Sequence, residues 1–118
     1  MAPCRLRIVV FPESRRSWTA RGLEHDLAAE GRSIEAAVDA VLKIALAHIA
    51  YDRRHRREPL SAFAPAPRLY WTAFKGGTAL PLSVEVPWSG DGPPAEVSAA
   101  VVHQHPAIRP FQVIARSA

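Results

Sequence analysis

The sequence of 118 residues has a single cysteine and no long apolar run, and both absences exclude whole classes of protein. Cys4 has no partner within the chain, so an internal disulfide is excluded and a reducing compartment is indicated. No stretch approaches the roughly 20 apolar residues of a membrane-spanning helix. The N-terminus also lacks the apolar core of a secretory signal. We therefore predict a soluble, cytoplasmic protein without a membrane partner.

Outside one short segment, the sequence has no excess of positive charge. The chain has 15 basic and 11 acidic residues, which gives a net charge of +4. The arginines at positions 53, 54, 56 and 57 account for the whole excess, since 11 basic residues then face 11 acidic ones. Thirteen of the basic residues are arginine, a bias that genome composition can produce. The basic balance therefore says little by itself about nucleic-acid binding.

The residue patterns of enzymes are absent as well. No serine lies in a Gly-x-Ser-x-Gly elbow, and no glycine-rich phosphate loop occurs. Glu24 and Asp26 are close in sequence, but two-metal hydrolysis needs carboxylates from separate elements, and the first predicted strand, Arg5–Phe11, has none. His103 and His105 would face one side of a strand, yet further metal ligands are lacking. We predict no catalytic residue, no metal site, no cofactor and no nuclease activity.

The composition that is present, 48% hydrophobic and 22% charged, is that of one globular domain. In Arg5–Phe11 both faces are apolar, which is typical of a central strand. Trp18–Leu23 alternates as a half-exposed neighbouring strand would, and the polar segment Pro12–Arg16 is predicted to be the turn between the two. A short third strand is predicted at Leu27–Glu30.

A long amphipathic helix follows these strands. Ser33 is a favourable N-cap, and Glu35 and Asp39 lie near the positive end of the helix dipole. Pro59 is predicted to end the helix. Apolar residues recur at intervals of three and four along one face, at Ile34, Val38, Val41, Leu42, Ala45 and Ile49.

The second half of the chain predicts a short helix and further strands. Pro67–Lys75 has proline in the first turn of the helix, and Gly76 and Gly77 end it. Leu80–Val86 alternates as a strand does, and Pro81 would confine that strand to a sheet edge. Two weaker strand patterns are Val97–His103 and Pro110–Ala115.

Together these elements predict an α+β fold, in which a small antiparallel sheet is packed by one long helix and a short second helix. Residues 1–77 would form a β-β-β-α core with the short second helix. Residues 78–118 would form a strand-like extension, which is either part of the same domain or an arm that binds a partner.

The junction Glu30-Gly-Arg-Ser33, between a third strand and a helix rich in Glu and Ala, resembles the HicB-like antitoxin family, which has Gly-Asp-Thr or Gly-x-Ser there. The resemblance covers roughly residues 5 to 75, and Pro65–Phe74 is similar to the segment after the long helix in one branch of the family. It implies a partial RNase-H-like fold. It also implies the antitoxin of a toxin–antitoxin system, which binds a small HicA-type toxin ribonuclease and occludes its active site.

The sequence departs from the family pattern in two places. Residues 76–118 show no ribbon-helix-helix or helix-turn-helix pattern, with which the family commonly binds its operator, so DNA autoregulation is not implied here. Glu24–Glu30 replaces the usual Pro-Asp-Leu-Pro-Gly before the glycine. The partner of this chain can therefore differ from the usual toxin.

The candidate partner-binding residues are Arg53, Arg54, Arg56, Arg57, Tyr70 and Trp71. The arginines suit a solvated helix end, an acidic protein surface or phosphate groups. Tyr70 and Trp71 are adjacent on the short helix, so they cannot both lie fully on its exposed side, and they suit a core as well as stacking on single-stranded bases.

The predicted function is protein–protein binding by a non-enzymatic, HicB-like protein, which can also be a homo-oligomer. One alternative is a nucleic-acid-binding accessory protein that uses the cluster Arg53–Arg57. Another is a non-catalytic structural subunit of a larger assembly, whose C-terminal strands pair with another chain.

Overall fold

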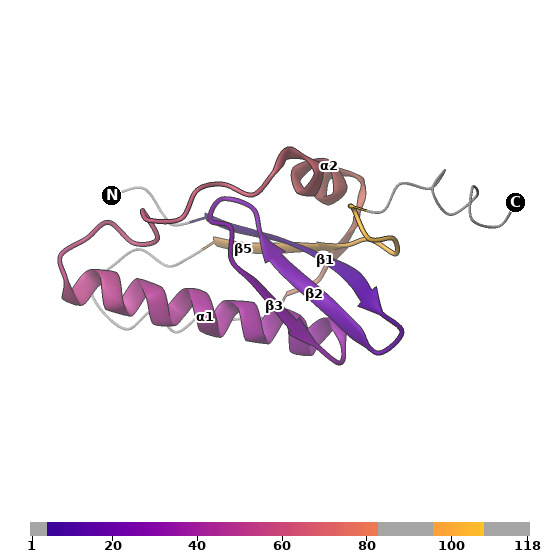
Figure 1. Cartoon of the computed structure of the whole chain (residues 1–118), viewed down its shortest axis with the longest axis horizontal. Helices are drawn as coiled ribbons and strands as arrows, with labels where there is room; N and C mark the ends of the chain where they lie inside the picture. Colours follow the sequence, from indigo (N-terminus) through magenta and orange to yellow (C-terminus); the bar gives the residue numbers. More distant parts are fainter. Residues whose placement is uncertain (1–4, 83–95, 108–118) are drawn as a thin grey trace, which may run out of the picture.

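The strand β1 (Arg5–Ser14) is the centre of a five-stranded sheet with a helix on each face (Figure 1). The computed structural model describes residues 5–82 and 96–107. The sheet order is β3-β2-β1-β5-β4. The other elements are β2 (Ser17–Gly22), β3 (Ala28–Gly31), α1 (Ile34–Arg54), α2 (Arg68–Gly76), β4 (Thr78–Leu80) and β5 (Glu96–Val101).

The two apolar faces of β1 explain why it lies in the middle. Ile8 and Val10 point to the core under α1, which also contains the apolar stripe of that helix. Val9 and Phe11 point to the opposite core, where Tyr70 of α2 covers them. The predicted α+β class and the central position of the first strand are therefore confirmed.

The sheet is mixed, so the prediction of an antiparallel sheet is wrong. β1 pairs with β2 in antiparallel fashion, but it pairs with β5 in parallel, from Arg5 opposite Glu96 to Val10 opposite Val101. Apolar alternation reports which face of a strand is buried and carries no information on strand direction. The direction of β5 is set by the route of the chain, which returns to β1 only after both helices and β4.

Several strand ends differ from the prediction. β1 continues to Ser14, with an irregular register between Pro12 and Ser14, so the turn to β2 is shorter than expected. β4 lies at the sheet edge, as predicted, but it ends at Leu80 and therefore does not include Pro81. β5 ends at Val101. Residues 83–86 and 110–115 lie outside the described ranges.

The helix α1 begins as predicted and ends earlier. The Ser33 hydroxyl accepts a hydrogen bond from the Ala36 N–H at 3.0 Å, which caps the first turn. The helix ends at Arg54 rather than just before Pro59, and Arg56 then adopts a positive φ of 56°. Within the described residues, no helix combines the length and the apolar character that a membrane crossing requires.

Candidate functional site

A depression of about 360 Å³ opens on the sheet face that carries α2. It collects residues from three strands, from α2 and from the segment after β5, which lie far apart in the sequence. The lining residues are Phe11, Glu13, Thr19, Arg21, Ala28, Ala29, Glu30, Tyr70 and His105. This mixture of aromatic rings and convergent polar groups is typical of a binding site.

One side of the depression is held together by the carboxylate of Glu13. The Thr19 hydroxyl donates a hydrogen bond to Glu13 Oε2 at 2.9 Å, and His105 Nε2 lies 3.3 Å from the same oxygen. The Ala107 N–H donates to His105 Nδ1 at 3.1 Å, so the neutral ring carries its proton on Nε2. Both ring nitrogens of His105 are thus engaged, and the ring meets Phe11 edge-on at 4.7 Å.

The other side is a guanidinium held by a carboxylate and an aromatic ring. Arg21 donates two hydrogen bonds to Asp26, at 2.6 and 2.9 Å, and one to the Tyr70 hydroxyl at 3.1 Å. Its guanidinium carbon lies 4.2 Å from the centre of the Tyr70 ring. The hydrogen bond to Asp26 raises the pKa of Arg21 above its ordinary value, more than partial burial lowers it. Arg21 is therefore a permanent cation in this wall.

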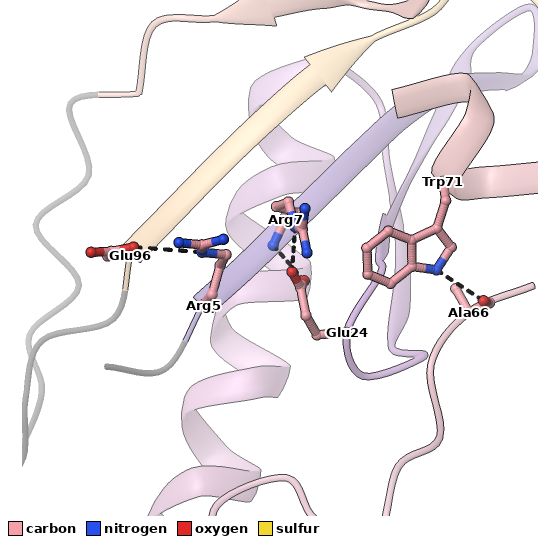
Figure 2. Close-up of polar contacts among 6 residues, drawn as sticks. All are labelled: Arg5, Arg7, Glu24, Ala66, Trp71 and Glu96. Atoms are coloured by element: carbon pink, nitrogen blue, oxygen red, sulfur yellow. Dashed lines mark hydrogen bonds and ion pairs between the residues drawn. The ribbon is translucent and has the colours of Figure 1, made fainter. Parts of the chain in front are cut away.

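The same arrangement recurs at the start of β1 (Figure 2). The Arg7 N–H donates to Glu24 Oε1 at 2.8 Å, and its side chain bonds the other carboxylate oxygen. Its guanidinium carbon lies 4.7 Å from the centre of the Trp71 ring. The Trp71 indole N–H donates to the carbonyl of Ala66 at 3.0 Å, which fixes the ring (Figure 2). A carboxylate thus holds a cation against an aromatic ring twice on this face of the sheet.

The six residues predicted to bind a partner fall in two separate regions. The four arginines lie at the end of α1 and in the loop after it, where all except the half-buried Arg53 are exposed. Tyr70 and Trp71 lie on α2, on the opposite face of the sheet. The Tyr70 side chain is buried and Trp71 is half-buried, so of these two aromatic rings only that of Trp71 is partly accessible to a partner.

The outer side of α2 forms a second hollow, of about 570 Å³. Arg68 and Lys75, both exposed, lie two turns apart on the helix with Trp71 between them, and Ala66 and Thr72 complete the described lining. This lining carries two cations and no carboxylate. An anionic group would fit it electrostatically.

Sequence reasoning missed Glu13, Thr19 and His105. The expectation that the first strand has no carboxylate is wrong, because β1 continues past Pro12 and includes Glu13. The expectation that both late histidines share a side of a strand is also wrong. β5 ends before them, and His103 meets the ring of Trp18 whereas His105 meets Phe11 on the other face. The first of these errors arose because Pro12 was expected to lie after the strand, whereas it lies inside β1.

Metal binding is not supported within the described ranges. In residues 5–82 and 96–107, no three or more His, Cys, Asp or Glu side chains are grouped so that they could hold an ion. Glu24 and Asp26 are instead each engaged by an arginine, Arg7 and Arg21. The absence of a metal site in the whole chain stays a prediction.

Comparison with known proteins gives no relative. No family model, no curated protein and no solved structure matches the chain. The HicB-like resemblance therefore remains an expectation from the sequence, and the function is inferred from that expectation together with the geometry of the described residues.

Proposed function

We propose that this chain is a HicB-like, antitoxin-type protein of the cytoplasm, which neutralises a small toxin ribonuclease by binding to it and occluding its active site. The observation that carries the proposal is that three carboxylates on the α2 face of the sheet are each held by a partner from within the fold. Glu24 and Asp26 each bind an arginine, and Glu13 accepts from a threonine and faces a histidine. These three carboxylates are held in place by their partners, which suits a fixed contact surface better than the binding of a metal or the activation of water.

The order of the elements supports the family assignment. β1, β2 and β3 form an antiparallel meander, and α1 follows directly and packs beneath it (Figure 1). The junction at Gly31 is tight, because a side chain there would meet the backbone of Ala36 and Ala37. Three strands, a glycine and a capped helix are the arrangement that the resemblance implies.

The cluster Arg53–Arg57 is the proposed docking point for an acidic region of the partner. Arg54, Arg56 and Arg57 are exposed, and the rest of the chain is neutral by count. Such a cluster accelerates association with a surface of opposite charge, more than it strengthens the final complex.

The test is a growth assay with the genes that flank this one. The proposal predicts that one of them encodes a short, basic protein that arrests growth by degrading RNA, and that co-expression of this chain restores growth. Replacing the four clustered arginines with glutamine should leave the fold intact and weaken the rescue at low expression. The matched control, with the same change in charge, replaces the exposed arginines Arg5, Arg15, Arg16 and Arg32. Arrest that persists at an excess of the wild-type chain would refute the proposal.

A second candidate, contact with single-stranded nucleic acid, is favoured by the cationic hollow of α2. Arg68 and Lys75 would contact phosphates, and the edge of Trp71 would meet a base. One face of the Trp71 ring is already covered by Arg7, which leaves little room for stacking. The first candidate is therefore preferred.

A further inference from the structure

Two cation sites on the α2 face of the sheet share one design. In each, a carboxylate holds a guanidinium that also lies against an aromatic ring: Glu24 holds Arg7 at Trp71, and Asp26 holds Arg21 at Tyr70. Both combine charge-assisted hydrogen bonds with a cation–π contact, which is the geometry that arginine satisfies better than lysine.

The depression also contains a third carboxylate, that of Glu13, which no guanidinium contacts among the described residues. Phe11 and Glu13 both line the depression, and only Oε2 of Glu13 takes part in a described hydrogen bond or ion pair. Glu30 also lines the depression, is exposed, and has no partner within residues 5–82 and 96–107. Among the described residues, one oxygen of Glu13 and both oxygens of Glu30 are thus without a donor.

The charges of the lining leave the depression negative. Arg21 is neutralised by Asp26 through two hydrogen bonds. His105 meets only Oε2 of Glu13 and accepts the Ala107 N–H at its other ring nitrogen. Within the described residues, the carboxylates of Glu13 and Glu30 therefore have no arginine or lysine partner, on a chain whose net charge is +4. A cation would therefore be attracted to this depression.

We propose that the depression binds the guanidinium group of an arginine that a basic protein partner inserts between Glu13 and Glu30. The volume of about 360 Å³ accommodates one long side chain, and the small residues Ala28 and Ala29 would contact its aliphatic stem. The inference rests on the proposed function, because a ribonuclease must carry cationic side chains to bind RNA. An arginine held here is withdrawn from the RNA-binding surface of that enzyme.

The test uses a short arginine peptide, acetyl-Gly-Arg-Gly-amide, titrated into the ¹⁵N-labelled full chain. The amide signals of Ala29 and Ala107, which flank the depression, should shift in a saturable manner. Glu13→Gln combined with Glu30→Gln should weaken the binding at least about tenfold, whereas Glu35→Gln combined with Glu58→Gln, which removes the same charge from exposed sites elsewhere, should not. The matching glutamine peptide should cause no shift.

Three results would overturn the inference: no saturable shift with the arginine peptide, equal shifts with the glutamine peptide, or equal loss of binding in both double variants. Glu30→Gln alone keeps the test valid if replacement of Glu13 disturbs the fold, since Glu30 is exposed. The peptide titration does not depend on the toxin. Rescue of growth without peptide binding refutes this inference alone, and peptide binding without rescue refutes the proposed function alone.

Discussion

Asp52 illustrates at the scale of single residues how the end of α1 is organised. Its side chain is buried, and its Oδ2 accepts a hydrogen bond from the Leu60 N–H at 2.8 Å. Leu60 is fully buried at a positive φ of 62°, a conformation that a non-glycine residue keeps only when its surroundings hold it. The Asp52 carboxylate thus fixes the loop that follows α1, and with it the positions of Arg56 and Arg57.

Replacing Asp52 with alanine is expected to lower the free energy of unfolding by about 1–3 kcal/mol, because the buried Leu60 N–H loses its acceptor. Chemical denaturation measures this difference. Asp39→Ala is the matched control, since Asp39 is exposed and its one ion pair among the described residues is with the exposed Lys43. A loss of stability no larger in Asp52→Ala than in the control would contradict the role assigned to Asp52.

Local features were predictable at this scale and contacts between distant residues were not. The cap at Ser33 follows from the residue type and its place before an amphipathic segment. The meeting of Glu13, Thr19 and His105 depends on which strands become neighbours, and no short-range pattern encodes that.

At the scale of elements, the close packing of β3 on α1 determines how the helix lies beneath the sheet. Gly31 ends β3, and a Cβ atom at this position would come within 2.4 Å of the Ala37 nitrogen and 2.7 Å of the Ala36 carbonyl carbon. These atoms belong to the helix backbone and cannot move independently. The sequence pattern predicted the helix and its start, because the period of 3.6 residues and the cap are local. It did not predict where β1 and α1 end, since Pro12 lies inside a strand and Pro59 well past a helix.

Gly31→Ala is therefore expected to destabilise the protein by about 1–3 kcal/mol through forced separation of β3 and α1. Gly76→Ala is the matched control, because no described atom beyond its chain neighbours and its own helix backbone lies within 4 Å of a Cβ at this last residue of α2. The control should be as stable as the wild type or more so, since alanine favours the helix. Thermal unfolding of both variants is the measurement, and equal melting temperatures would show that the junction is not tight.

At the scale of the whole molecule, the two proposed contact surfaces lie on different sides of the sheet. The basic cluster Arg53–Arg57 follows α1, and the negative depression with Glu13 and Glu30 lies on the α2 face. A partner that engages both must carry an acidic and a basic region and reach around one end of the sheet. The basic cluster could be predicted by counting charges along the sequence, because its arginines are neighbours in the chain. The depression could not be predicted without the strand order, in which the strands of residues 5–31 lie beside the strand of residues 96–101.

The central claim is that the chain binds a ribonuclease, and that it neither binds RNA nor cleaves RNA itself. The most direct test is RNA cleavage by the purified partner ribonuclease, titrated with this chain at two RNA concentrations, both in excess over the enzyme. We predict that cleavage stops at one fixed ratio of chain to enzyme, the same at both RNA concentrations, and that the chain alone cleaves no RNA. Inhibition that follows the ratio of chain to RNA instead of the ratio of chain to enzyme, or cleavage by the chain alone, would contradict the claim.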